Sequence, residues 1–149
     1  MKNWVFREKI LPLLVVILGG LLSIILVYAA YFAVYMTIEG LFYEDVTQTP
    51  TDTIRFYTSL GLCLIWVLIS RIRMPDMAKA ALGVGPLTML MVVIFFRIYP
   101  TPGWAVLSTT GVGLVAALFV FMYKKQWFYY LVPILALLIS TWYSWPRPY

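Results

Sequence analysis

The side chains that could carry acid–base, nucleophilic or metal chemistry are few in this sequence. Its 149 residues include 11 Lys and Arg, 6 Asp and Glu, one cysteine and no histidine. A metal site needs clustered His, Cys or carboxylate ligands, and a Ser or Cys nucleophile needs a base beside it. Cys63 lies alone in an apolar run, and the glycines before Pro86 lack the third glycine of a dinucleotide-binding loop. We therefore expect a protein that is not an enzyme and binds no metal or cofactor.

Charged residues avoid the middle of every long apolar segment. Proton relays through a membrane use ionisable side chains at that depth, where each costs about 3 kcal/mol on insertion scales and is kept for function. The sequence thus disfavours proton-coupled transport by this chain alone.

Composition indicates that lipid is the solvent of this chain. Hydrophobic residues make up 63% and charged residues 11%, and the mean hydropathy is +0.91. Each crossing of a bilayer needs about 20 apolar residues, so five crossings use most of the length. We predict an all-α, polytopic helical membrane protein with one transmembrane domain over residues 1–149 and no soluble catalytic domain.

Apolar runs and their polar breaks set the predicted helices. The first run is far longer than the roughly 7–15 apolar residues of a secretory signal, which predicts an uncleaved first helix. Pro86 predicts a kink in the third helix, and the longest connector runs from Glu39 to Thr53. The predicted membrane-spanning helices cover about residues 10–38, 54–70, 80–96, 104–123 and 127–145.

Basic residues predict the orientation. Arg55, Arg97 and Arg147 fall on one side of the predicted membrane. The other side holds eight of the eleven: Lys2, Arg7, Lys9, Arg71, Arg73, Lys79, Lys124 and Lys125. The positive-inside rule then places the N-terminus in the cytoplasm and the C-terminus outside. The net charge of +5 reports this topology rather than nucleic-acid binding, and we expect the bacterial cytoplasmic (inner) membrane. Trp66 is the one tryptophan away from a predicted helix end.

An aromatic face of the first helix is one candidate surface. Tyr28, Tyr31, Phe32, Tyr35 and Glu39 fall within about 100° at 3.6 residues per turn. Such a face is either an aromatic-lined path or partner surface with an acid at its outer mouth, or simply a packing surface between helices.

A seam of small residues on the fourth helix is a second candidate surface. Thr109, Gly113, Ala116 and Ala117 lie on one side, together with Val120. Small residues allow close approach of another helix in lipid, either within the chain or from a partner. Gly19 and Ser23 of the first helix repeat the spacing.

Three further patterns have alternative interpretations. Ser108, Thr109 and Thr110 line a substrate path, or their hydroxyls bond to the carbonyl four residues earlier. Glu39 and Arg97 are predicted at the outer ends of two helices, where they form a candidate ion pair worth roughly 0–1 kcal/mol. The loop from Arg71 to Lys79 binds a partner or anionic lipid, or only signals topology.

Three short stretches accompany the predicted helices in a fixed order: Thr49 to Phe56, Pro102-Gly103-Trp104 and Trp145-Pro146. This order of parts resembles that of the small membrane subunit of tripartite tricarboxylate transporters, the TctB-like family. The resemblance implies a non-catalytic partner of a large transport subunit that receives solute from an extracytoplasmic binding protein.

Three functions fit these patterns. The first is an accessory subunit of a multi-subunit complex, of the solute-transporter kind, with the bilayer and a larger membrane subunit as partners and no nucleic acid. The second is a self-sufficient homo-oligomeric transporter or channel whose pore uses Tyr28, Tyr35, Ser108 and Thr109. The third is an assembly or structural subunit of a respiratory or secretory complex.

Overall fold

The computed structural model describes residues 6–42, 50–99, 101–123 and 125–145. These residues form helices, with no strand among them. The elements are the π-helical turn η1 (Phe6–Ile10), α2 (Leu11–Phe42), α3 (Thr51–Ile69), α4 (Asp76–Ile98), α5 (Pro102–Met122), the 3-10 turn η3 (Trp127–Tyr130) and α6 (Leu131–Ser144). Lys2, Lys124 and Arg147, which entered the charge count, lie outside the described residues.

In the part of the chain that the structure describes, five helices are long and apolar enough to cross a membrane, which confirms the predicted all-α, polytopic helical fold. Their ends differ by a few residues from the prediction. α4 begins at Asp76 rather than at residue 80, because Pro75 precedes it and a carboxylate in the first turn suits the positive end of the helix dipole. The predicted loop from Arg71 to Lys79 is therefore partly helical. α2 also continues past Glu39 to Phe42.

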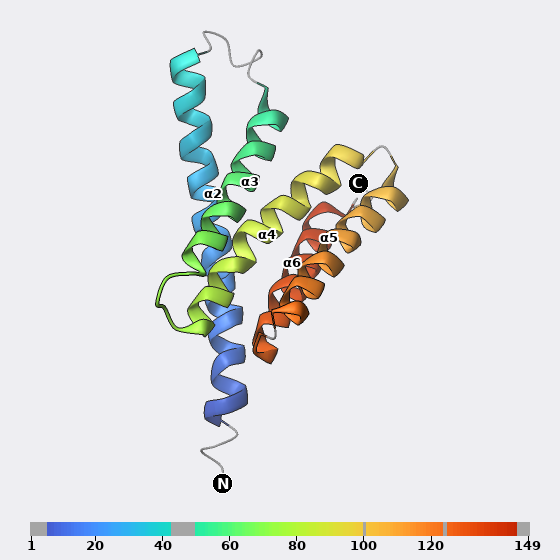
Figure 1. Cartoon of the computed structure of the whole chain (residues 1–149). Coiled ribbons are helices and arrows are strands. Elements are labelled where there is room, and N and C mark those ends of the chain that lie inside the picture. Colours follow the sequence, from blue (N-terminus) through green and yellow to red (C-terminus); the bar gives the residue numbers. More distant parts are fainter. Residues whose placement is uncertain (1–5, 43–49, 100, 124, 146–149) are drawn as a thin grey trace.

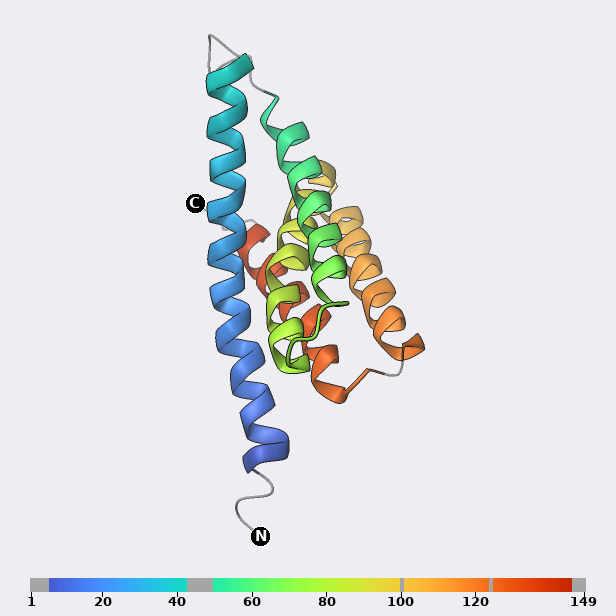
Figure 2. The same cartoon turned by 60° about the vertical axis from the view of Figure 1, so that its left-hand side comes forward.

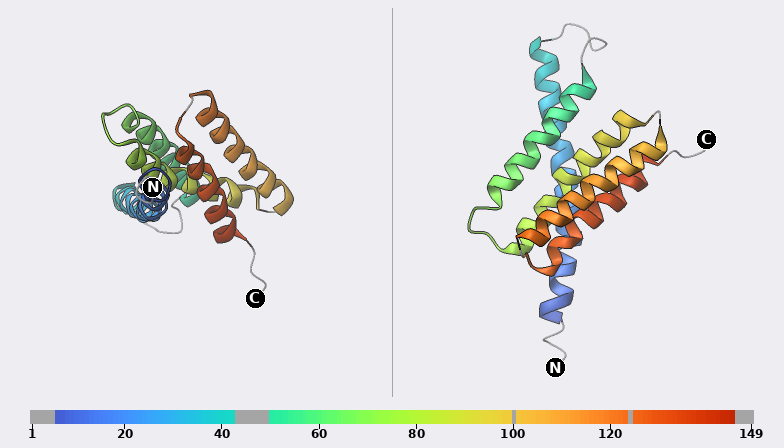
Figure 3. Two further views of the ribbon diagram at one scale, coloured as in Figure 1. Left: turned by 90° about the horizontal axis from the view of Figure 1, so that it is seen from below. Right: turned by 45° about the vertical axis from the view of Figure 1, so that its right-hand side comes forward.

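The helices form two groups that diverge toward one end (Figure 1). α2 and α3 make one group, and α4, α5 and α6 run inclined to α2 in the other. Figure 2 shows α2 as a long rod along one side, extending beyond the other helices at both ends. Seen from below in Figure 3, α2 is viewed nearly end-on while α5 and α6 run across the view.

α4 is the central helix of the molecule. It contacts α2, α3, α5 and α6, and 61% of its membrane span is buried inside the chain, against 11% for α3. The core around it contains Val16 of α2, Val84 and Met91 of α4, and Val132 and Ala136 of α6. Lipid is as apolar as these side chains, so close fit rather than hydrophobicity holds the helices together.

Small residues allow α2 to approach α4 closely. A Cβ added at Gly19 would lie 2.9 Å from the Cβ of Ala81, and one at Gly20 would lie 3.0 Å from a methyl group of Val84. The predicted small-residue spacing at Gly19 and Ser23 thus serves packing within the chain.

The two ends of the molecule differ in their connections. The start of α2, the α3–α4 loop and the α5–α6 connection lie together at what we call the proximal end (Figure 1). The distal end holds the end of α2, the start of α3 and the α4–α5 turn. The described basic residues of the connections at the proximal end are Lys9, Arg71, Arg73, Lys79 and Lys125.

Candidate functional site

Ser23 of α2 bonds to α4 at the position where Pro86 interrupts its hydrogen bonding. Pro86 has no N–H, so the carbonyl of Leu82 loses its helical partner. The Ser23 hydroxyl donates to that carbonyl at 2.9 Å and accepts from the Gly85 N–H at 3.3 Å. Ser23 is 3% exposed. A neighbouring side chain thus satisfies the backbone group that proline frees, and α4 continues through Pro86 as one helix.

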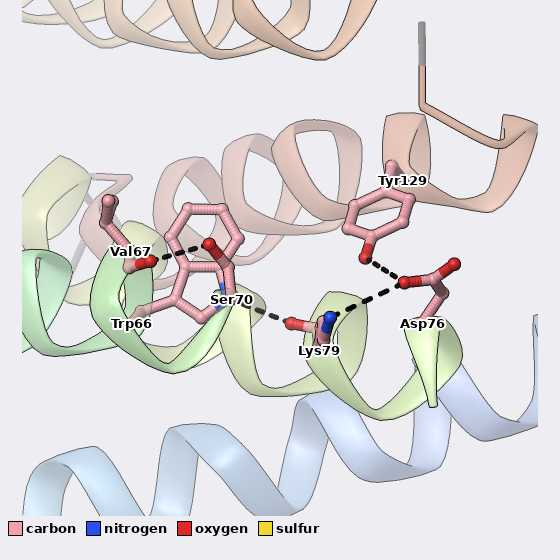
Figure 4. Close-up of polar contacts among 6 residues, drawn as sticks. All are labelled: Trp66, Val67, Ser70, Asp76, Lys79 and Tyr129. Carbon is pink, nitrogen blue, oxygen red and sulfur yellow. Dashed lines mark hydrogen bonds and ion pairs between the residues drawn. The ribbon is translucent and has the colours of Figure 1, made fainter. Parts of the chain in front are cut away.

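Trp66 connects α3 to α4 (Figure 4). Its indole Nε1–H donates to the carbonyl of Lys79 at 2.8 Å. Its ring lies against Gly83, where an added Cβ would come within 2.5 Å of two ring carbons. This contact explains why one tryptophan departs from the interfacial pattern of the other five.

A polar cluster joins the start of α4 to η3 at the proximal end, and we call Asp76, Lys79, Lys125 and Tyr129 the proximal polar cluster. Figure 4 shows three of its members, Asp76, Lys79 and Tyr129. The Tyr129 hydroxyl donates to Asp76 Oδ1 at 3.3 Å, and Lys79 Nζ lies 3.8 Å from the same oxygen. Lys125 Nζ lies 5.5 Å from the centre of the Tyr129 ring. The Asp76 carboxylate thus lies between a phenol and one ammonium group, and it forms a structural tie rather than a nucleophile–base pair.

The small-residue seam of α5 faces the interior of the chain. Thr109 and Gly113 are buried, and a Cβ added at Gly113 would lie 3.2 Å from Leu137 of α6 and 3.4 Å from Met91 of α4. Ala116 packs against the core, and Ala117 is half-buried. The seam therefore holds α5 on α4 and α6.

Two of the three hydroxyl groups of α5, those of Thr109 and Thr110, bond to their own helix. Thr109 donates to the carbonyl of Ala105 at 2.7 Å, and Thr110 donates to that of Val106 at 2.8 Å. This confirms the backbone-bonded interpretation for both threonines. Because Thr109 is buried and its donor is already used, it is a poor candidate for a pore lining.

The aromatic face of α2 is partly covered by α3. Tyr31, Tyr35 and Glu39 are half-buried, whereas Tyr28 and Phe32 are more exposed. The Tyr31 and Tyr35 rings lie 6.1 Å apart, and the guanidinium of Arg55 lies 5.5 Å from the centre of the Tyr31 ring. The structure thus brings a cation from α3 onto this face, a contact that the sequence pattern did not indicate.

The predicted ion pair between Glu39 and Arg97 is not formed. The ion pair present among the described residues is that of Asp76 and Lys79. The Arg97 guanidinium instead lies 5.1 Å from the centre of the Phe56 ring of α3. α4 diverges from α2 toward the distal end (Figure 1), and the contact of Arg97 is with α3.

α3 leaves an apolar groove open beside the distal half of α2. The groove has a volume of about 440 Å³. Its lining residues are Val34, Ile38, Thr53, Ile54, Tyr57, Thr58, Gly61, Leu62 and Ile65. The groove is almost entirely apolar, so it suits an acyl chain or an apolar helix and offers no chemistry for a reaction.

Two residues of these sites escaped prediction for identifiable reasons. Ser23 was noticed only for its size, although an intramembrane proline always frees a carbonyl that some polar side chain has to satisfy. In the sequence, Arg55 counted only as one of the basic residues on the outer side, although cations near tyrosines form ring contacts. In the described part of the chain, no three His, Cys, Asp or Glu residues gather closely enough to hold a metal.

The fold and these contacts define an all-α integral membrane protein with five helices able to span the bilayer. Comparison with known proteins adds no family: no family model, no curated protein and no solved structure matches the chain.

Proposed function

We propose that this chain is a small, non-catalytic accessory subunit of a multi-subunit membrane complex, of the solute-transporter kind. The main support for the proposal is that α3 is both poorly buried and only moderately apolar. Only 11% of its span is buried inside the chain, yet it is less apolar than the spans of α2, α4 and α5. A helix that faces lipid over most of its surface should be among the most apolar, so a protein partner is the better match for this surface.

Thr58 on the groove supports the same interpretation. Thr37, Thr88 and Thr110 each donate to the carbonyl four residues earlier. Within the described residues, Thr58 makes no such bond, and Tyr57 beside it is 67% exposed. Polar side chains on a membrane-facing surface find their partners across a helix interface.

The filled centre of the molecule also favours a partner role. Val16, Val84, Met91 and Ala136 are 0% exposed, and the buried hydroxyls of Ser23, Thr88 and Thr109 each donate to a backbone carbonyl. A chain that transported solute by itself would need a polar path through this centre.

The resemblance in layout to TctB-like subunits suggests which complex this would be. In such a complex, a large transport subunit receives solute from an extracytoplasmic binding protein. The basic connections gathered at the proximal end support an orientation with that end in the cytoplasm of a bacterial cell. Both statements belong to the proposal and are tested with it.

Reconstitution separates this function from that of a self-sufficient transporter. Purified chain in liposomes is assayed for uptake of radiolabelled citrate and for proton flux with an internal pH dye, beside liposomes without protein. We expect the two preparations to behave alike. Uptake or proton flux above the protein-free level would show that the chain moves solute on its own and would remove the accessory role.

A further inference from the structure

Aromatic and cationic side chains of four helices converge at the distal end. α2 contributes Tyr28 and Tyr31, α3 contributes Arg55 and Phe56, α4 contributes Phe96 and Arg97, and α6 contributes Tyr143. We call these seven residues the distal arginine–aromatic cluster. The contacts that join them are Arg55 over Tyr31 at 5.5 Å, Arg97 over Phe56 at 5.1 Å and Phe96 against Tyr143 at 6.4 Å. Tyr28 lies within electrostatic reach of Arg55 and Tyr143.

Neither arginine of the cluster has a carboxylate partner in the described part of the chain. Glu39 and Asp52 belong to the same end, but neither forms an ion pair with Arg55 or Arg97. Each guanidinium carries five N–H donors. The aromatic ring beside it interacts with its positive charge and does not serve as a conventional acceptor for these donors. Among the described residues, the cluster therefore presents two guanidinium groups without an acidic partner.

The position and chemistry of the cluster favour a phosphate group as its ligand. Guanidinium binds phosphate through paired, charge-assisted hydrogen bonds, which an ammonium does not reproduce. The members of the cluster on α3, α4 and α6 lie near the ends of those helices, whereas Tyr28 and Tyr31 lie within the longer α2. The exposed Trp104 and Trp142 lie at the neighbouring ends of α5 and α6. Tryptophan at helix ends is typical of the headgroup layer, which is where phospholipid phosphates lie.

We infer that the distal arginine–aromatic cluster is a phosphate-binding site, with Arg55 and Arg97 as its ligating residues and a phospholipid headgroup as the source of the phosphate. Ring contacts hold Arg55 on Tyr31 of α2 and Arg97 on Phe56 of α3. This site is independent of the accessory function and would exist whatever complex the chain joins.

Native mass spectrometry of the delipidated full chain, titrated with phosphatidylglycerol, tests the inference. Arg55→Gln and Arg97→Gln are each expected to weaken binding of the first lipid about tenfold, the loss of one charge-assisted contact. Arg71→Gln is the matched control, because Arg71 is an exposed arginine at the proximal end. It is expected to bind as the parent chain does. Arg55→Lys keeps the charge without the paired donors and is expected to fall between the two.

A second titration identifies the source of the phosphate. If excess inorganic phosphate leaves the bound lipid in place, the lipid headgroup is the ligand. If it displaces the lipid from the parent chain, the site takes free phosphate, and the lipid assignment is wrong. Binding by Arg55→Gln and Arg97→Gln equal to the parent, or an equal loss in Arg71→Gln, would overturn the site itself. Monodisperse elution of every variant on a sizing column shows that the chains compared are folded.

Discussion

At the residue scale, the most informative contact is between Ser23 and the backbone that Pro86 disrupts. Pro86 indicated a kink from the sequence, but the sequence gives no contact between positions this far apart. The structure shows that the freed Leu82 carbonyl receives the Ser23 hydroxyl at 2.9 Å. Serine was predictable as a small residue at a close crossing, whereas its bonding role depends on which helix lies against α4.

A double-mutant cycle measures this contact. Ser23→Ala is expected to lower the free energy of unfolding by about 1 kcal/mol, because a buried carbonyl is left without a donor. In a Pro86→Ala background the new N–H can bond the Leu82 carbonyl, so the cost of Ser23→Ala should fall. Unfolding in mixed micelles with increasing dodecyl sulfate gives the four stabilities. Equal costs of Ser23→Ala in both backgrounds would show that the hydroxyl does not compensate for proline.

At the element scale, the sequence predicted α4 as one of five similar spans. It did not predict that α4 is the central helix. Burial in a soluble protein is visible as a hydrophobic face, but in lipid the inner and outer faces of a helix are both apolar. The remaining signal is side-chain size. Gly83 and Gly85 let Trp66 of α3 and Ser23 of α2 lie close against α4, whereas the sequence suggested these glycines only as an incomplete dinucleotide-binding loop. Thr109 and Gly113 of α5 were expected to allow close packing, and packing within the chain was one of the two alternatives, beside packing against a partner.

A pair of glycine substitutions tests the close crossing of α2 and α4. A Cβ at Gly85 would lie 2.5 Å from the Ser23 hydroxyl oxygen and 2.6 Å from the Ser23 carbonyl oxygen. Gly85→Ala should therefore force the helices apart and destabilise the chain by about 1–3 kcal/mol. Gly111→Ala on α5 is the control, because nothing lies within 4 Å of its added Cβ. The same unfolding assay compares them, and an equal effect of the two changes would argue against the crossing.

At the scale of the whole molecule, composition and run length were enough to predict five spanning helices in order. Their ends were less predictable, since polar residues such as Asp76 and Glu39 belong to helices that continue into the headgroup layer. The divergence of the two helix groups could not be predicted, because it depends on where Gly85 and Trp66 place the crossings. The expected Glu39–Arg97 pair failed for that reason.

Cysteine labelling tests whether the proximal and distal ends lie on opposite sides of the membrane. Cys63 is replaced by alanine, and single cysteines are placed at Arg73 in the α3–α4 loop or at Thr101 in the α4–α5 turn. Both positions are exposed. A membrane-impermeant maleimide should reach position 101 in intact cells and position 73 only after the cells are opened. The reverse pattern would invert the proposed orientation, and labelling of both in intact cells would mean that α4 does not span.

The composition of the purified complex tests the accessory role most directly. The tagged chain is isolated in mild detergent and weighed by native mass spectrometry. We predict that a larger multi-spanning membrane protein is bound to the chain at fixed stoichiometry. We also predict that this protein is lost from the complex when Tyr57→Ala and Thr58→Val are introduced on α3. Leu118→Ala on the exposed face of α5 should leave it bound; Leu118 is 59% exposed, beside 67% for Tyr57. A monomer or homo-oligomer with no larger protein, or equal loss with Leu118→Ala, would contradict the account.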